Sequence, residues 1–571
     1  MAGCKELILA LACAAPASAA TLAFRNTAPG VQYTGSRACA ACHKTIYDKY
    51  VRMAMGRSIS IARAGIWREP AHIHNDALGR DYRVFDKGGA LYQSESEEKN
   101  GATVFDAAHK LEYAIGSGEN GVSFVVRRGA YLFQAPLSYY AKAGQWDLSP
   151  GFEKADEGFS RPIYEACIIC HAGRPQAAPG RDGMYRDPPF AEMAIGCENC
   201  HGPGMLHVQE RSRGARGLPD TSIVNPARLP ARLAEDICMA CHQAGDARVL
   251  LPGKRYTDFR PGAPLLQTVA IIGLPVQDAT SDLLQHHTAM KLSQCYRATS
   301  GRLSCLTCHD PHIQPDAVAA PSYFRAKCLT CHTSQSCRLA SSARQRTTPQ
   351  DNCIGCHMPK RNVNNISHSA LTNHRIPIDP GDLPKAGSRP AEHPELPGLE
   401  LLNAQPGKIA LPLLTRLAAY GELMNRAPSL RAQYFALLEQ AKRELPSDPL
   451  VLAALGRKAL AEHSPDAIDL LARAEQKGTP AVSTYIDLSE ALMEAGRLRD
   501  SIRALERGVQ AYPYSKPVRK HLVLAYIRDK AYARAKSALE SYVEDFPEDS
   551  FMRGLLARAT TAPAGPNIQQ H

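Results

Sequence analysis

The segment Cys39-Ala-Ala-Cys42-His43 is the first of seven copies of the pattern Cys-x-x-Cys-His in this chain. Two thiols at this spacing can bond one porphyrin covalently, and the adjacent histidine can bind its iron. The pattern therefore predicts seven covalently attached haem c groups. The attachment cysteines are Cys39, Cys42, Cys167, Cys170, Cys197, Cys200, Cys238, Cys241, Cys305, Cys308, Cys328, Cys331, Cys353 and Cys356.

Two other uses of paired cysteines fit the pattern less well. Zinc sites use Cys-x-x-Cys pairs, but they do not need a histidine directly after the second cysteine. A thioredoxin-like redox pair would need one motif in a βαβ setting, whereas this chain has seven. Haem attachment is therefore the favoured interpretation.

The amino-terminal residues favour export. Residues 1–20 have the pattern of a secretory signal peptide, with Lys5 before an apolar run at 7–15 and small residues at 17–19. Cys13 follows too short an apolar run for a lipoprotein anchor. No later stretch is long and apolar enough to span a membrane. We therefore expect a periplasmic or secreted protein without a transmembrane span.

The compartment bears on the remaining cysteines, and the haems bear on the net charge. Of 18 cysteines, only Cys295 and Cys337 lie outside the signal peptide and the seven motifs. This even remainder predicts a disulfide in an oxidising compartment, and the alternative is two separate buried thiols. The formal net charge is +11. Two propionates on each haem would bring it to about +4 in the oxidised protein, so we predict no nucleic-acid binding.

The chain divides into segments of different composition. Residues 21–375 contain every motif at roughly 50 residues per haem, so the porphyrins must supply most of the buried apolar surface. Alternating apolar residues between motifs one and two predict a small antiparallel β insert at about 72–140. Residues 376–399 are proline-rich and are expected to form a linker. Residues 400–560 are helical and repetitive, and we expect residues 561–571 to be disordered.

The helical segment repeats with a period near that of a tetratricopeptide repeat. Prolines recur at spacings of 34, 33 and 34 residues, at Pro446, Pro480, Pro513 and Pro547. Such repeats stack helix pairs into an α-solenoid with a concave surface, which we expect to bind a protein or peptide. The alternative is packing on the haem region or on another copy of the chain. The predicted fold class is thus mainly α, with a haem-packed domain followed by the solenoid.

The histidine count predicts that most irons have two histidine ligands. The proximal ligands, one from each motif, are His43, His171, His201, His242, His309, His332 and His357. Nine further histidines lie in the haem region, and the best-placed candidates for second ligands are His74, His207, His286, His287, His312, His368 and His374. A second strong protein ligand makes an electron carrier, whereas an open position makes a possible catalyst.

Loop length distinguishes these candidates. His207 and His312 follow motifs three and five so closely that each should reach a neighbouring haem, which would pack the porphyrins in a chain. His286 and His287 are adjacent, so we expect only one of them to be a ligand. His74 opens the β insert and is a further candidate.

Longer stretches around the motifs carry a family signal. They include Tyr33-Thr-Gly-Ser-Arg-Ala-Cys39, Trp146-Asp-Leu-Ser-Pro-Gly151, Cys305-Leu-Thr-Cys308-His309-Asp-Pro-His312 and Cys356-His357-Met-Pro-Lys360. Together they resemble multihaem cytochromes c with carboxy-terminal tetratricopeptide repeats, a group similar to the tetrahaem cytochrome that accepts electrons from hydroxylamine oxidoreductase. The resemblance implies electron transfer. One departure is that Glu119 and Asn120 follow Gly-Ser-Gly where relatives have a histidine.

These features predict a heptahaem electron carrier that acts between redox partner proteins. No catalytic residue is assigned, and the chain has no Cys-x-x-Cys-Lys motif of the ammonia-forming nitrite reductases. One alternative is a multihaem oxidoreductase acting on a small nitrogen or sulfur compound at one open haem. Another is a repeat-based scaffold in which the haems are structural.

Overall fold

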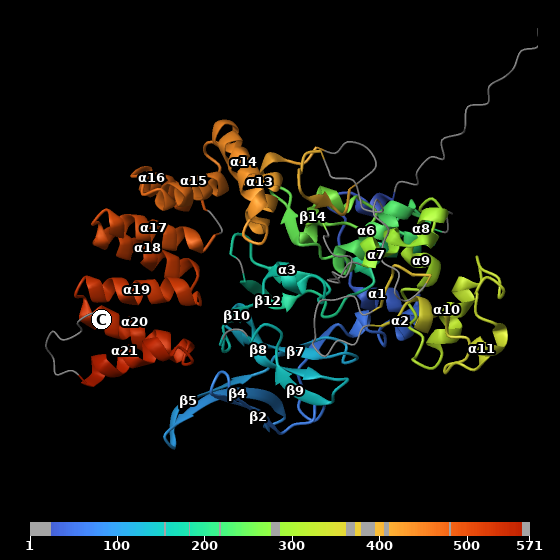
Figure 1. Ribbon diagram of the computed structural model, residues 1–571, viewed down its shortest axis with the longest axis horizontal. Coiled ribbons are helices and arrows are strands. Elements are labelled where there is room, and N and C mark those ends of the chain that lie inside the picture. The colour runs from blue at the N-terminus through green and yellow to red at the C-terminus, as the bar shows by residue number, and fades with distance from the viewer. Residues whose placement is uncertain are drawn as a thin grey trace, which may run out of the picture.

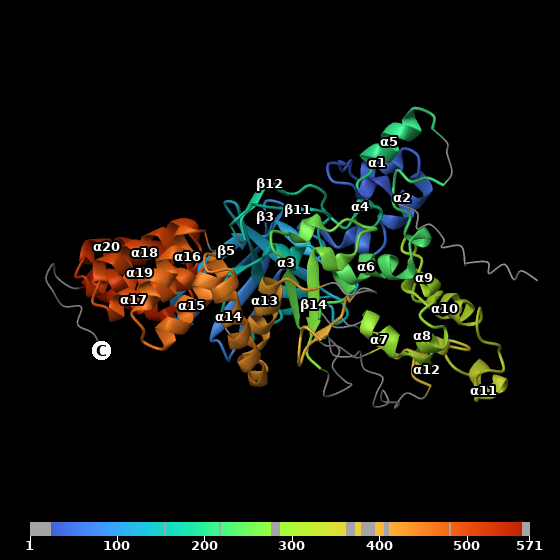
Figure 2. The same ribbon diagram turned by 90° about the horizontal axis from the view of Figure 1, so that it is seen from above.

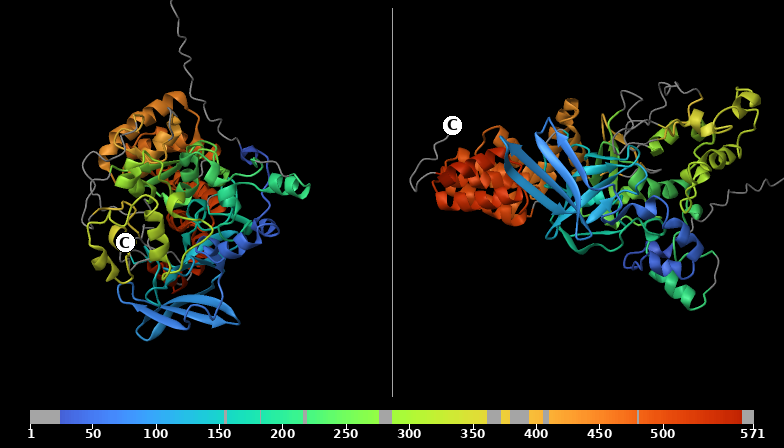
Figure 3. Two further views of the ribbon diagram at one scale, coloured as in Figure 1. Left: turned by 90° about the vertical axis from the view of Figure 1, so that its right-hand side faces the viewer. Right: turned by 90° about the horizontal axis from the view of Figure 1, so that it is seen from below.

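The structure is a computed structural model that describes residues 24–153, 156–181, 183–215, 219–275, 286–360, 372–378, 394–404, 410–478 and 481–561. The predicted signal peptide, most of the predicted linker, His368 and nearly all of the predicted tail lie outside the described residues. Along the long axis the helical repeats lie at one end, two β-sheets lie in the middle, and helices bearing the later motifs lie at the other end (Figures 1 and 2). The view from below in Figure 3 gives the same order.

Two antiparallel sheets pack face to face between motifs one and two. The four-stranded sheet has the order β2 (Ala71–Asn75), β3 (Arg80–Lys87), β4 (Ala90–Lys99) and β5 (Ala102–Lys110). The six-stranded sheet has the order β1 (Ile59–Ile61), β6 (Tyr113–Ile115), β7 (Val122–Arg128), β8 (Tyr131–Tyr140) and β10 (Arg161–Pro162), with β9 (Gln145–Leu148) also paired to β8. Tyr82 and Val84 alternate inward from β3 and share one core with Phe124 and Phe133.

A buried polar side chain ties the two sheets together. Gln93 Nε2 donates to Leu137 O at 3.0 Å, and Gln93 Oε1 accepts from Leu137 N at 3.0 Å. The amide therefore satisfies both of its polar ends inside the core, as burial of a polar group requires.

This β region is larger than the predicted insert. The two expected hairpins are confirmed as β3–β4 and β7–β8. However, strands on both sides of residues 72–140 complete the second sheet, so the amino-terminal part is rich in strands and a mainly α class describes only the rest. The physical reason is that this stretch has no haem motif, so it must bury a core of its own side chains.

Two smaller sheets were not predicted. One pairs β11 (Pro175–Ala177) with β12 (Tyr185–Phe190), and the other has the order β13 (Ala247–Leu250), β14 (Val269–Gly273) and β15 (Glu400–Leu401). The helices outside the repeats are short: α1 (Ser36–Ala40), α2 (Lys44–Tyr50), α3 (Glu165–Ile168), α4 (Glu198–His201), α5 (Met205–Ser212), α6 (Ala231–His242), α7 (His286–Leu292), α8 (Gln294–Ala298), α9 (Cys305–Cys308), α10 (Ala320–Cys328), α11 (Ser341–Gln345) and α12 (Cys353–His357).

The carboxy-terminal segment is an array of stacked helix pairs, as predicted. Its helices are α13 (Leu413–Leu423), α14 (Arg431–Glu444), α15 (Pro449–Ala461), α16 (Asp466–Gln476), α17 (Ser483–Glu494), α18 (Leu498–Ala511), α19 (Lys516–Arg528), α20 (Tyr532–Asp545) and α21 (Ser550–Thr561). Asp448 caps α15 by accepting from Leu450 N at 2.9 Å and Val451 N at 3.2 Å. Pro513 and Pro547 lie just beyond α18 and α20, where a helix must end.

The array is packed on the rest of the molecule at its first helix. Leu396 and Leu399, at the end of the predicted linker, are fully buried and share a core with Ile272 and Tyr420. Strand β15 pairs with β14, and Tyr420 donates its hydroxyl to Pro397 O at 2.8 Å. The end of the predicted linker therefore belongs to a core and does not act as a spacer, because Leu396 and Leu399 are buried.

The far end of the array packs on the β region. Tyr514 contacts Tyr131 and Phe133 edge-on, with ring centres 5.3 and 5.5 Å apart. Arg128 Nη1 donates to Asp545 O at 3.1 Å, and Arg80 donates to the carbonyl of residue 548 at 3.2 Å. Among the described residues, no helix is long and apolar enough to cross a membrane.

Candidate haem-binding site

Each Cys-x-x-Cys-His copy forms a turn of helix or lies at a helix end. The amide of the motif histidine donates to the carbonyl of the first cysteine in motifs one, three, five and six, at 2.8, 3.0, 2.9 and 3.0 Å. Residues i, i+3 and i+4 share one face of a helix, so this turn presents both thiols and the imidazole on the same side. The local structure thus brings together the three groups that the haem prediction requires.

Three motif histidines each stack on a histidine that follows a different motif. The ring centres of His43 and His207 are 6.3 Å apart, with planes at 20°. His201 and His312 are 5.9 Å apart at 20°, and the third pair, between His309 and residue 374, is 6.2 Å apart at 28°. Since a metal–nitrogen bond is about 2 Å long, two imidazoles on opposite sides of one metal ion have centres roughly 6 Å apart. These three separations match that arrangement.

A fourth motif histidine has a closer and differently oriented neighbour. The ring centres of His242 and His286 are 5.4 Å apart, with planes at 82°, and His286 also lies 4.7 Å from His374. Nε2 of the adjacent His287 is 2.9 Å from Glu235 Oε2. The structure thus places His286, rather than His287, at the motif.

The remaining predicted ligands have different surroundings. His74 lies on exposed strand β2, with Nδ1 3.1 Å from Asp81 and Nε2 3.5 Å from Asp76. The prediction that His74 is a ligand is not supported, because its strand belongs to the four-stranded sheet and both nitrogens face carboxylates. His171 follows α3, and its carbonyl accepts from Ser58 Oγ at 2.6 Å. His332 is exposed after α10.

The Nδ1 atoms of several paired histidines already have acceptors. His201 Nδ1 donates to Val224 O at 2.8 Å, and His207 Nδ1 donates to Asp220 Oδ2 at 2.9 Å. Nδ1 of His312 lies 3.2 Å from Asp310 Oδ1. Nδ1 of the motif histidine His357 donates to Pro377 O at 2.9 Å, and Nδ1 of His374 donates to Thr372 O at 2.9 Å. A proton fixed on Nδ1 leaves the Nε2 lone pair free for a metal.

Burial keeps these imidazoles neutral. It lowers the pKa of His201 and His242, and together with the neighbouring His374 it lowers the pKa of His309 to about 4. A neutral imidazole is the form that binds a metal. His201, His242 and His309 are therefore in the required protonation state at neutral pH.

Motif thiols also lie beside thiols of other motifs. A hydrogen bond to Cys197, followed by burial, raises the pKa of the Cys39 thiol. In the same way, a hydrogen bond to Cys170 and burial raise the pKa of the Cys241 thiol. A hydrogen bond to Cys238 and burial raise the pKa of the Cys305 thiol. Motifs one and three, two and four, and four and five are therefore neighbours in space.

The segment with the last three motifs has almost no core of its own. Among the aliphatic and aromatic side chains of described residues 286–360, only Met290 is buried, whereas Ile313, Val318 and Leu339 are at least 41% exposed. A segment of this length cannot hold a fixed fold without buried apolar surface. Porphyrins attached at its three motifs would supply that surface, so these residues also fit haem.

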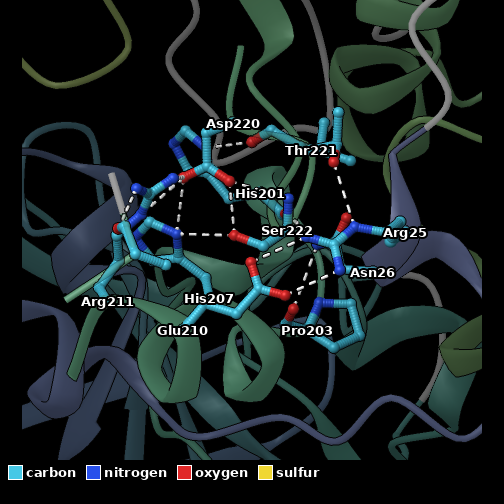
Figure 4. Close-up of polar contacts among 12 residues, drawn as sticks. Arg25, Asn26, His201, Pro203, His207, Glu210, Arg211, Asp220, Thr221 and Ser222 are labelled. Atoms are coloured by element: carbon cyan, nitrogen blue, oxygen red, sulfur yellow. Dashed lines mark hydrogen bonds and ion pairs between the residues drawn. The ribbon is translucent and has the colours of Figure 1, made fainter. Parts of the chain in front are cut away.

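Side chains around motif three hold motif one in place. Buried Glu198 accepts from Thr34 N at 2.9 Å, from Gly35 N at 2.7 Å and from Gly204 N at 2.7 Å. Asn26 Nδ2 donates to the carbonyl of residue 201 at 2.9 Å. Figure 4 shows this region, where Arg25 pairs with Glu210, and Asp220 lies between His207, Arg211 and Ser222.

Neither Glu198 nor Asp220 stood out in the sequence. Both act through backbone or imidazole partners that are brought close only by the fold, and no spacing marks them. Glu198 directly follows the first cysteine of motif three, which is the only local signal.

The expected disulfide is not formed. Cys295 and Cys337 are separate, partly buried thiols in the structure. Burial raises the pKa of Cys295, with a smaller contribution from Cys331. Cys337 lies close enough to Cys353 to affect its pKa. The two cysteines thus lie near different motif cysteines, and both are partly buried, whereas the alternative to the disulfide was two separate buried thiols. Among the described residues, no group of three or more metal-ligating side chains gathers in one place.

The chain ends in a tetratricopeptide-repeat array. The region before the array carries the seven motifs, mostly in short helices, and is rich in strands between motifs one and two. Residues 492–559 match the tetratricopeptide repeat family. No curated protein matches the chain. Among solved structures it is similar to the APC/C hetero-tetramer Cut9-Hcn1, with 22% identity and a TM-score of 0.23 over 26% of this chain and 29% of that chain. It is also similar to MamA protein, with 18% identity and a TM-score of 0.21 over 25% of this chain and 86% of that chain. The chain therefore spans less than a third of the first of these relatives.

Proposed function

We propose that this chain is an exported heptahaem c-type cytochrome that carries electrons between redox partner proteins. The observation that carries the proposal is the set of three stacked imidazole pairs, each of which joins the histidine of one motif to a histidine that follows another motif. Two protein ligands per metal is the number that a six-coordinate haem iron takes, whereas a structural zinc ion takes four.

The residues have distinct roles in this proposal. The fourteen motif cysteines attach the porphyrins, and the seven motif histidines bind from one side. His207, His312, His374 and His286 bind from the other side at motifs one, three, five and four. When bound, each haem supplies an iron that takes up or releases one electron. Histidine on both sides of these four irons leaves no position there for a substrate, which favours a carrier over a catalyst.

The same contacts give the sites an order. The stacked pairs connect motif one to three, three to five, and five to seven. The thiol contacts connect motif two to four and four to five. The six sites linked in this way form one connected set with a branch at motif five, and electrons can pass between neighbours in it.

The array is proposed to bind a partner protein. The amino-terminal pattern supports export of the chain. Tetratricopeptide repeats commonly mediate protein–protein interaction. Because the first helix of this array packs on the β13–β14 sheet and its far end packs on the β region, we assign redox-partner docking to the part of its surface between those ends. The signal-peptide pattern of residues 1–20 supports a periplasmic or secreted location, where haem attachment to c-type cytochromes takes place.

Intact mass tests the proposal. Mature protein from a host with a haem-attachment system should exceed its polypeptide mass by seven haems. A variant with both Cys39→Ala and Cys42→Ala should exceed it by six, and a variant with Cys295→Ala should still exceed it by seven. Six or fewer haems in the unaltered protein, or zinc in their place, would contradict the proposal.

A further inference from the structure

The second nitrogen of the paired histidines has two kinds of partner. Backbone carbonyls accept from Nδ1 of His201, His357 and His374. A carboxylate accepts from Nδ1 of His207, because Asp220 Oδ2 lies 2.9 Å away, and Ser222 Oγ lies 3.1 Å away. His207 therefore has a full negative charge on the far side of its ring, a feature that it shares with His312, whose Nδ1 lies 3.2 Å from the more exposed Asp310.

Asp220 is held firmly in that position. It accepts from Ser222 N at 2.8 Å and Ser222 Oγ at 2.5 Å, and from Arg211 Nε at 3.2 Å, as Figure 4 shows. Its side chain is only 18% exposed. The carboxylate is thus fixed against the ring by its hydrogen bonds to Ser222 and Arg211.

We infer that Asp220 is a positioning residue that lowers the reduction potential of the haem held by His43 and His207. The inference rests on the proposed function. A carboxylate that accepts the Nδ1 proton makes the imidazole a stronger donor, and a stronger donor stabilises the oxidised iron relative to the reduced iron. No bond forms or breaks, because the proton stays on Nδ1 and only one electron is exchanged at the iron.

The position of this site gives the effect a direction. Motif one lies at the end of the path through motifs three, five and seven. At motif three, Asp310 also faces the second ligand, His312, but its side chain is 41% exposed and water screens it more strongly. At motif five the partner of His374 is a neutral carbonyl. By this contribution, the potential is lowered most at motif one, less at motif three and least at motif five.

Two variants with opposite expected effects test the inference. Asp220→Asn keeps an acceptor oxygen and removes the charge, so the midpoint potential of one haem should become more positive. Arg211→Gln removes the cation that partly neutralises Asp220, so the same haem should become more negative. Glu210→Gln is the control, because it makes the same charge change as Asp220→Asn but pairs with Arg25 and does not contact His207. It should leave that potential nearly unchanged.

The readouts are a redox titration of the full-length holoprotein and its low-temperature EPR spectrum. Seven haems, an unchanged set of low-spin signals and opposite shifts for the two variants support the inference. No shift, or a shift equal to that of Glu210→Gln, overturns it while leaving the proposed function intact. If the unaltered protein instead has no low-spin signal from the His43–His207 site, the proposed function itself fails there.

Discussion

At the scale of single residues, the chain completes one site with a histidine that belongs to another. His312 follows motif five by three residues, yet its ring stacks on His201 of motif three at 5.9 Å. Its own Nδ1 is 3.2 Å from Asp310. The exchange of second ligands ties neighbouring motifs together, so the loss of one side chain should open one site without removing its haem.

His312→Ala should therefore create one new ligand position. Histidine is a strong ligand on iron, and the unaltered reduced protein should bind no carbon monoxide if its irons are six-coordinate. The variant should bind about one equivalent, seen as a shift in part of the Soret band. His74→Ala is the control, because His74 lies on strand β2 and both of its ring nitrogens face carboxylates. Equal binding by both variants would contradict the assignment of His312.

The sequence anticipated some of these residues for a clear physical reason. A short loop after a motif limits where the next histidine can go, which is why His207 and His312 were predicted to reach a neighbouring site. The structure gives no support for His74 as a ligand, because its neighbours form a strand whose alternation turns the side chain outward. Asp220 was missed because a carboxylate near a ligand becomes significant only when the fold brings it to the ring.

At the scale of elements, the helical repeats depend on close packing at glycine. A Cβ added at Gly508 of α18 would lie 2.9 Å from Val518 Cγ1 and 3.1 Å from Tyr485 Cβ. Gly554 of α21 has no atom within 4 Å of such a Cβ. The two positions are both helical, so they separate the packing effect from the intrinsic preference of alanine for a helix.

Gly508→Ala should lower the free energy of unfolding by about 1–3 kcal/mol, because the added methyl overpacks the contact between helices. Gly554→Ala should raise it by about 0.5–1 kcal/mol, because alanine favours the helix and nothing opposes it. Denaturant unfolding followed by circular dichroism measures both. Stabilisation by both substitutions would show that the helices around Gly508 are not packed this closely.

The sheets show where pattern reasoning reaches its limit. The hairpins β3–β4 and β7–β8 were predicted because alternation runs through long strands that flank glycine turns. Strands β13 and β14 were missed because short apolar runs such as Val269–Gly273 fit a buried strand or a buried helix equally well. Residues 400–401 pair with β14 across more than a hundred residues, and no local pattern signals such a contact.

At the scale of the whole molecule, the array is part of the folded body. The structure packs its first helix on the β13–β14 sheet and its last helices on the β region. The sequence predicted a linker before the array, because residues 376–399 are proline-rich. The buried leucines among those prolines overrule that interpretation.

A chain ending at Ile378 should therefore be strongly destabilised. It loses Leu396, Leu399 and Leu401 from a shared core, and each such side chain contributes about 1.5–3 kcal/mol when fully buried. A chain ending at Thr561 is the control, since it keeps every array helix. Thermal unfolding of the two holoproteins compares them. An unchanged unfolding temperature for the shorter chain would mean that the array is independent after all.

Low-temperature EPR of the fully oxidised protein tests the central claim most directly, because it separates irons with two strong ligands from irons with an open position. The account predicts low-spin signals only, together with no binding of carbon monoxide by the reduced protein. A high-spin signal of stoichiometric intensity that changes on addition of nitrite or hydroxylamine would contradict it and would identify a catalytic haem.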